Sequence, residues 1–176
     1  MISVFSKCAR NNAWANNRLH DAVALLPDDE FRKERDAFFP SIRETLNHIL
    51  EVDHYYIDAV YGNTRPYSAI GPIDHQNLSD LSKEQYVSDD RLVDFCDNAD
   101  DETLLQKVKT DRGERGVVEE TVADLLMHLF QHQVHHRGQV HNMLSQTDVK
   151  PPQLDDFFLE FERDPDAALR LQTFRI

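Results

Sequence analysis

The sequence predicts a mostly α-helical protein built as a bundle of long helices, and three observations support this prediction. The longer hydrophobic patterns repeat at helical spacing, as in helices that bury one face. Only five glycines occur, and hydrophobic residues make up 40% against 29% charged residues, the composition of an ordinary globular protein. With 176 residues the chain can form one sizeable core but hardly two, so we expect a single domain over residues 1–176.

Four long helices and one short helix are expected from the periodicity and from the signals at their ends. The first covers residues 4–26 and stops at Pro27, before an acidic turn. The second follows Ser41, which forms a capping-box pair with Glu44, and ends near residue 61, before Gly62. The other expected elements are a crossover loop at 62–77, a helix at 82–98, a hairpin or extended link at 104–118, a long helix at 121–146 and a short accessory helix at 154–162.

Charge and hydropathy argue against two classes of partner. The formal net charge of −13 opposes binding to phosphate backbones and to anionic membrane surfaces. No apolar run approaches the roughly 18 residues of a membrane span, and the N-terminus does not resemble a signal peptide. Cys8 and Cys96 form no CxxC motif, and free thiols suit a reducing compartment. We therefore expect a cytoplasmic protein with no nucleic-acid or membrane partner.

Four of the nine histidines, at positions 128, 132, 135 and 136, fall within nine residues of the helix expected at 121–146. His132 and His136 occupy positions of the apolar stripe between Leu129 and Val140, whereas the other two lie nearer the polar face. Their i, i+4 spacing places two imidazoles side by side on one helix face. Two buried imidazoles need partners, which could be hydrogen bonds within a polar layer or a bound cation. The spacing alone favours neither interpretation.

A third metal ligand would have to come from another helix, and His48 is the candidate. It lies at the edge of the apolar stripe of the second helix, where a side chain can face a neighbouring helix. On its own, such a histidine is more often a hydrogen-bonded boundary residue than a ligand. His54 falls on the polar face, and we expect it in solvent; we expect the remaining three histidines, His20, His75 and His141, at the surface.

Asp53 lies within the apolar stripe of the second helix, on a different side from His48. A buried carboxylate needs hydrogen-bond donors. We expect it to bridge to the first helix, where the candidate donors are Asn12, Asn16, Arg18 and Trp14.

Two residues predict where helices or whole chains pack together. Gly138, in the middle of the long helix, costs about 1 kcal/mol relative to alanine, which suggests a close helix approach there. Trp14 lies opposite the apolar stripe of the first helix, and an exposed tryptophan often marks a contact surface. Trp14 therefore favours a homodimer formed by helix packing.

The sequence also resembles a known family. The stretch HLFQHQVHHRGQVHNML at 128–144 looks like the signature of the DinB family of bacterial proteins, the DinB/YfiT-like metalloenzymes. SIRETLNHILEVDHYY at 41–56 resembles the histidine-bearing second helix of that family, and NNAWANNRL at 11–19 resembles its first helix. The resemblance covers nearly the whole chain in the same order.

This resemblance implies a four-helix bundle of up-down-down-up type with one divalent-metal site, often in a homodimer. Carried over by position, the metal ligands would be His48, His132 and His136. Imidazole ligands suit zinc, nickel, iron or copper, and we expect zinc or nickel foremost, with iron also suitable. The family name refers to damage-inducible expression and does not imply DNA binding.

The resemblance also implies a function. Relatives include thiol-dependent S-transferases and a maleylpyruvate isomerase that use low-molecular-weight thiols. We therefore expect a metal-dependent enzyme in which a metal-activated thiolate or water attacks a small electrophilic substrate, like a thiol S-transferase or a hydrolase. The alternative is a non-catalytic metal-binding protein of the stress response. The sequence identifies no catalytic base beside the three histidines.

Overall fold

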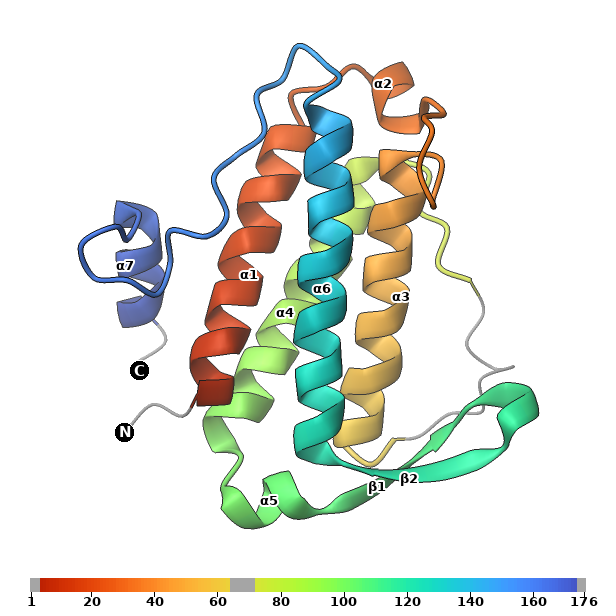
Figure 1. Ribbon diagram of the computed structural model, residues 1–176, viewed down its shortest axis with the longest axis vertical. Coiled ribbons are helices and arrows are strands. Elements are labelled where there is room, and N and C mark those ends of the chain that lie inside the picture. The colour runs from red at the N-terminus through yellow and green to blue at the C-terminus, as the bar shows by residue number, and fades with distance from the viewer. Residues whose placement is uncertain (1–3, 64–71, 174–176) are drawn as a thin grey trace.

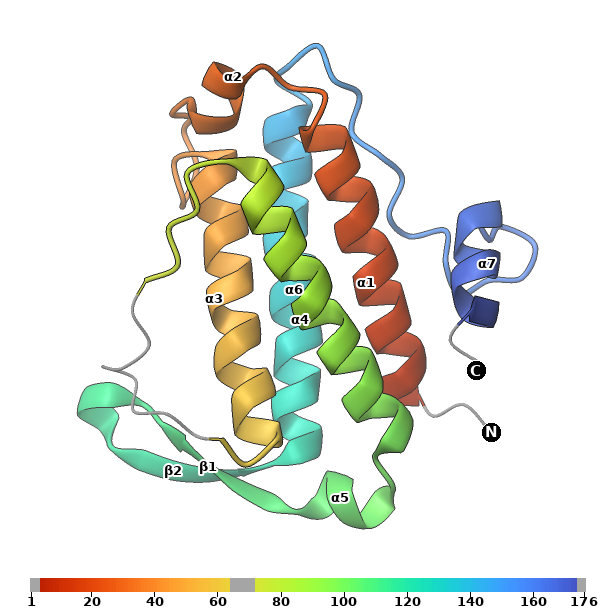
Figure 2. The ribbon, with the colours of Figure 1, turned by 180° about the vertical axis from the view of Figure 1, so that it is seen from behind.

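The computed structural model describes residues 4–63 and 72–173, and four long helices make up most of it. These helices are α1 (Val4–Val23), α3 (Ile42–Val60), α4 (Leu78–Asn98) and α6 (Val122–Leu144). α1 packs against α4 and α6, and α3 packs against the same two helices. α1 and α6 run upward in Figure 1, whereas α3 and α4 run downward, as the reverse view in Figure 2 shows for α4. The prediction of a mostly helical protein is confirmed.

The shorter elements lie at the ends of the long helices and beside them. They are α2 (Asp28–Arg32), α5 (Asp101–Leu105), β1 (Lys107–Asp111), the 3₁₀ turn η2 (Gly113–Arg115), β2 (Val117–Thr121) and α7 (Pro165–Thr173). The two strands pair antiparallel, with Lys107 opposite Thr121, so of the two alternatives expected at 104–118 the hairpin is present, and it extends three residues further. The hairpin extends beyond the lower ends of α3 and α6 (Figure 1). Among the described residues, no helix is long and apolar enough to cross a membrane.

Side-chain caps define most helix starts. The Ser41 hydroxyl accepts the Glu44 N–H at 3.1 Å, which confirms the predicted start of α3. α4 begins at Leu78, one turn before the predicted residue 82, because Asn77 caps it. α1 ends at Val23 and continues as a turn to residue 26. Part of the loop expected at 62–77 lies outside the described residues; 72–77 form neither helix nor strand.

The accessory helix expected at 154–162 is wrong, as is the expected exposure of Trp14. Residues 154–162 form turns, and α7 begins only at Pro165, whose ring suits the first position of a helix. The turns place Phe157, fully buried, against Trp14, with ring centroids 5.5 Å apart. Trp14 is only 1% exposed, so it gives no support to a contact surface. The homodimer stays a prediction that rests on the family resemblance.

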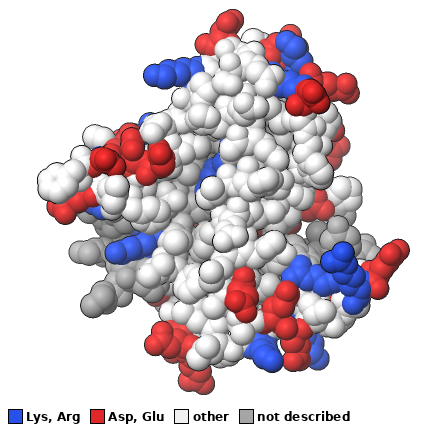
Figure 3. All heavy atoms as spheres, viewed as in Figure 1, with Lys and Arg blue, Asp and Glu red and all other residues white. Residues whose placement is uncertain are grey.

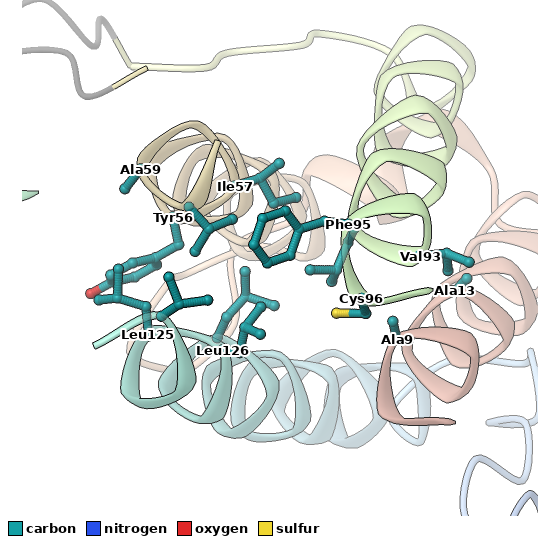
Figure 4. Close-up of a cluster of buried hydrophobic side chains, with 14 residues drawn as sticks. Ala9, Ala13, Tyr56, Ile57, Ala59, Val93, Phe95, Cys96, Leu125 and Leu126 are labelled. Carbon is teal, nitrogen blue, oxygen red and sulfur yellow. The ribbon is translucent and has the colours of Figure 1, made fainter. Parts of the chain in front are cut away.

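The apolar core has two large clusters at opposite ends of the long helices and a smaller one that contains Trp14 and Phe157. One large cluster, drawn in Figure 4, contains Ile57, Phe95 and Leu125 and lies toward the hairpin. The other large cluster contains Leu46 and Val140 and lies toward α2. Between them, every long helix contributes buried polar residues; we call this set the polar layer, and it comprises Asn12, Asn16, Asp53, Gln85, Asp89, Gln133 and Arg137.

Asp53 belongs to this layer, but its predicted bridge to the first helix is wrong. Its carboxylate accepts hydrogen bonds from Gln85 of α4 at 2.7 Å and from Gln133 of α6 at 2.5 Å. The α1 residues Asn12 and Asn16 instead donate to Asp89 of α4, at 3.2 and 2.9 Å. The helical wheel identified the buried side of the helix but not which neighbour lies across it.

Arg137 completes the polar layer from α6. Its guanidinium donates to Asn12 at 2.5 Å, to Asn16 at 2.9 Å and to Gln133 at 3.0 Å. The layer thus holds one guanidinium and two carboxylates, all buried. Burial and the charge of Asp53 raise the pKa of Asp89 to about 8. A protonated Asp89 leaves the charges of Asp53 and Arg137 balanced at neutral pH.

Gly138 also departs from expectation. No atom lies within 4 Å of the position that a Cβ would occupy there, so the close helix approach inferred from this glycine is wrong. Gly138 is exposed on the outer face of α6.

The raised pKa of Asp89 predicts how the metal-free protein responds to pH. Between about pH 6.5 and 8 the folded state holds a proton on Asp89 that the unfolded state has lost, so the contribution of Asp89 to stability falls as pH rises. The buried histidines, whose pKa values are lowered, change stability in the opposite direction, and they do so equally in the wild type and in Asp89→Asn. We expect the free energy of unfolding of the wild type, relative to that of Asp89→Asn, to fall by about 2 kcal/mol across this window.

Urea denaturation in the presence of a chelator measures this fall. Asp89→Asn is the matched control, because asparagine is isosteric with the protonated carboxyl and does not ionise. The histidines contribute equally in both proteins, so the difference between the two unfolding free energies isolates the contribution of Asp89. Parallel profiles for the two proteins would contradict the prediction.

Candidate metal centre

The three histidines predicted as metal ligands meet between α3 and α6. His48 comes from α3, and His132 and His136 come from successive turns of α6. Each offers a ring nitrogen, and these three nitrogens all lie within 4.8 Å of one another. The ring centroids are 4.9 Å apart for His48 and His132, 4.8 Å for His48 and His136, and 4.3 Å within the α6 pair. Residues far apart in the sequence therefore form one compact group that could hold a metal ion.

The surroundings keep these imidazoles neutral. Burial, together with the neighbouring His136, lowers the pKa of His48 to about 4. Burial and the other histidines lower the pKa of His132 to about 3, and burial also lowers the pKa of His136. At neutral pH each ring therefore keeps a lone pair, as metal ligation requires.

Hydrogen bonding orients His136. Its Nδ1 lies 2.8 Å from Gln139 Oε1, a carbonyl oxygen that can only accept, so Nδ1 carries the proton and Nε2 is left with its lone pair. The Gln139 amide also reaches His135 Nε2 at 3.1 Å. A partner of this kind, which fixes the tautomer of a ligand, is typical of metal-binding histidines.

The geometry of the other two rings fits a cation between them. His48 Nε2 and His132 Nε2 face each other at 3.0 Å. Two lone pairs at that distance repel unless one nitrogen is protonated or a cation lies between them. His132 Nδ1 is buried and has no hydrogen-bond partner among the described residues. Three neutral imidazoles leave a divalent ion its full charge and an open position, as in catalytic rather than structural zinc sites.

Phe39 covers one side of the group. Its ring lies 4.4 Å from the ring of His48 and 5.6 Å from that of His136, and Phe38 packs edge-on against it at 4.9 Å. Phe39 belongs to the segment between α2 and α3, outside any helix. It shields the histidines from solvent on that side.

A cavity of about 460 Å³ lies beside two of the histidines. Volumes of 300–1,000 Å³ are usual for small-molecule sites. The residues lining it are His48, Glu51, Val52, Tyr55 and Tyr56 from α3, His128 and His132 from α6, and Asp111, Arg112 and Arg115 from the hairpin region. Neither Phe39 nor His136 lines it, so a small molecule in this cavity would reach the histidine group at His48 and His132.

Arg112 attaches the hairpin, which lines part of the cavity, to α3. Its guanidinium donates to the Tyr56 hydroxyl at 2.8 Å and pairs with Glu120 at 2.5 Å. It also lies over the rings of Tyr55 and Tyr56, 5.8 and 5.4 Å from their centroids. The Tyr55 hydroxyl donates to the carbonyl oxygen of Asp111 at 2.5 Å. The cavity therefore depends on the hairpin being attached to this helix.

The histidines outside the group divide into two sets. His128 and His135 are exposed, as predicted, although His128 lines the cavity with its ring 6.2 Å from that of His132. The surface assignment of His20 is wrong. It is 2% exposed, its Nδ1 lies 2.8 Å from the Ser82 hydroxyl, and burial lowers its pKa to about 4.

The remaining three histidines are half-buried, with polar partners. His75 Nε2 lies 2.6 Å from Glu84, and His54, expected in solvent, lies 3.5 Å from the same carboxylate. His141 Nε2 lies 3.1 Å from the carbonyl oxygen of Pro152. None of these residues belongs to the three-histidine group.

Sequence reasoning missed three residues around the group. Gln139 follows His136 by three residues, and that helical spacing could have identified it as a partner. Phe39 and Arg112 lie outside the helical patterns, in segments without a signal for contact with a histidine. Only the tertiary structure places them.

Comparison with known proteins agrees with this architecture. The family model described as DinB family matches residues 1–167. The chain belongs to the DinB family. The protein DinB of Bacillus subtilis (strain 168) is 26% identical over 140 residues, which cover 77% of this chain and 81% of that protein. The crystal structure of a DinB-like protein from Bacillus cereus ATCC 10987 superposes with a TM-score of 0.60 at 16% identity, covering 80% of this chain and 90% of that one.

For a metal ion held on the three histidines, the geometry predicts which substitutions in this DinB-family protein would remove it. His136→Ala and His48→Ala should each weaken metal affinity by more than about 100-fold, the upper range seen when only a residue supporting a ligand is replaced. Both proteins should stay helical, because the core clusters do not include these residues. Metal content after dialysis, with circular dichroism, measures both effects.

His135→Ala is the matched control, because it removes an exposed neighbour of the same residue type. It should retain nearly one metal ion per chain. Retention by His136→Ala with loss by His135→Ala would contradict the assignment, and retention by His48→Ala would exclude α3 as the source of the third ligand.

Proposed function

We propose that this DinB-family protein binds one divalent transition-metal ion, zinc or nickel foremost and iron otherwise, on His48, His132 and His136. We further propose that it is a metal-dependent enzyme that acts on a small electrophilic substrate, in the manner of a thiol S-transferase or a hydrolase. The observation that supports both proposals is the convergence of three neutral imidazoles beside a cavity of small-molecule size.

The chemistry follows from the charge of the site. A divalent ion on three neutral ligands lowers the pKa of a water or thiol bound to it. The chain supplies the surroundings: Phe39 excludes water on one side, and Tyr55 and Tyr56 form an apolar wall for the substrate. A low-molecular-weight thiol is the proposed partner, with thiol transfer favoured over hydrolysis by the family resemblance.

The alternative is a non-catalytic metal-binding protein of the stress response. A structural ion would contribute directly to folding, and its removal would cost much of the thermal stability. The position of the histidines favours catalysis, because they lie at the edge of the polar layer and beside a cavity. The two apolar clusters hold the helices together without them.

Chelation distinguishes these functions. Zinc-loaded protein should accelerate the reaction of 2-mercaptoethanol with 1-chloro-2,4-dinitrobenzene, and treatment with a chelator should abolish the acceleration. The melting temperature, followed by circular dichroism, should change by only a few degrees. A large loss of melting temperature without any acceleration would favour the stress-response alternative.

For the architecture, we propose the up-down-down-up four-helix bundle of the family. The directions and packing of α1, α3, α4 and α6 support this assignment.

We also propose that the protein forms a homodimer through the outer face of α6. Met127 and Val134 are 54% and 62% exposed on this helix, and Gly138 leaves room beside them. The middle of this face carries few charged side chains (Figure 3). An exposed apolar surface of this kind is typical of contact sites between proteins.

Light scattering at micromolar concentration tests the homodimer. We expect the mass of two chains for the wild type and of one chain for Val134→Glu, because a charge on this face opposes association. Val87→Glu is the control, since Val87 is 61% exposed on α4. A wild-type monomer would contradict the proposal.

A further inference from the structure

The cavity beside the histidines contains a carboxylate that has no partner among residues 4–63 and 72–173. Glu51 lines this cavity together with His48 and His132. It is half-buried, and it forms no hydrogen bond or ion pair with the residues that the structure describes. Glu51 follows His48 by three residues, so the two side chains are neighbours on one face of α3, about 5–6 Å apart at Cβ. Because it is not one of the three converging residues, its carboxylate is available to a ligand in the cavity.

The charged groups that the hairpin region contributes to this cavity are exposed or engaged in other contacts. The carboxylate of Asp111 accepts the N–H of Gly113 at 2.8 Å. Arg112 pairs with Glu120. Arg115 is exposed in the turn of the hairpin. The two guanidinium groups cannot accept a proton, and Asp111 belongs to the hairpin rather than to the helix that carries His48.

The remaining ionisable groups belong to α3 and α6. The hydroxyls of Tyr55 and Tyr56 take part in the hydrogen bonds that attach the hairpin, and burial raises the pKa of Tyr55, so it holds its proton. His128 is exposed at the rim, where its ring packs against Tyr56 at 5.1 Å. Glu51 is therefore the half-buried group that can accept a proton and that follows His48 most closely along α3.

Resting on the proposed function, we infer that Glu51 is the proton acceptor of this site. It would take the proton of a thiol that enters the cavity and binds beside His48 and His132. The sulfur–hydrogen bond breaks, an oxygen–hydrogen bond forms on the carboxyl group, and sulfur keeps the electron pair with which it attacks the electrophile. The proton then passes to the leaving group or to water.

The environment of Glu51 suits this role. Burial raises the pKa of its carboxyl above the ordinary value, which makes the carboxylate a stronger base than one in solvent. General bases work best when their pKa lies near the operating pH.

The test follows thiol binding rather than turnover. Cobalt-loaded wild type, Glu51→Gln and Glu114→Gln are mixed with 2-mercaptoethanol, and the sulfur-to-cobalt absorption is recorded in a stopped-flow instrument at several pH values. For the wild type we expect a binding rate nearly independent of pH between about 6.5 and 8, because the neutral thiol reacts with the ionised carboxylate. In Glu51→Gln the rate at pH 7 should fall about 100-fold and then rise about tenfold per pH unit, since only thiolate already in solution can bind.

Cobalt content separates this role from a structural one. Glu51→Gln should bind as much cobalt as the wild type, and Glu114→Gln, a matched change on the exposed η2 turn, should show wild-type rates. A wild-type rate and pH profile in Glu51→Gln would overturn the inference. So would the expected change appearing in His128→Gln instead, which would make His128 the acceptor. If the wild type shows no sulfur absorption, the proposed thiol chemistry fails, and the assignment of Glu51 fails with it.

Discussion

Two carboxylates and one guanidinium, buried between two apolar clusters, set the constraint on which the rest of the structure depends. Buried charges are tolerated only when they are paired and hydrogen-bonded. Asp53, Asp89 and Arg137 come from three helices, and Asn12 and Asn16 of the fourth helix complete their hydrogen bonds. Each long helix must therefore present its polar residues at the same level, which restricts its height and its rotation about its own axis.

The same restriction positions the histidines. Gln133, which donates to Asp53, lies between His132 and His136 in the sequence, so this bond joins the two helices that carry the candidate ligands. With Gln133 and Arg137 directed into the polar layer, the α6 histidines turn toward His48 and come within reach of its ring. The polar layer and the three histidines therefore depend on the same relative height and rotation of α3 and α6.

The sequence by itself determined the features that depend on local interactions. Helical periodicity and caps such as Ser41 located the four long helices to within about a turn. The i, i+4 spacing placed His132 and His136 on one inward face, and the edge position of His48 directed it toward a neighbouring helix. The family resemblance then connected these three residues into one candidate site. All of these signals lie within a few residues of the feature that they predict, because caps and helix faces are set by short-range geometry.

Only the tertiary structure decided what lies across from each helix face. A helical wheel shows that Asp53 is buried but not that Gln133 faces it. It placed Trp14 in solvent because Phe157, which covers this side chain, lies more than 140 residues further along the chain. The cavity likewise exists because Arg112 attaches the hairpin to α3, which encloses Glu51 in one cavity with His48 and His132. These contacts join segments far apart in the chain, and they form only when packing and the pairing of buried polar groups are satisfied together.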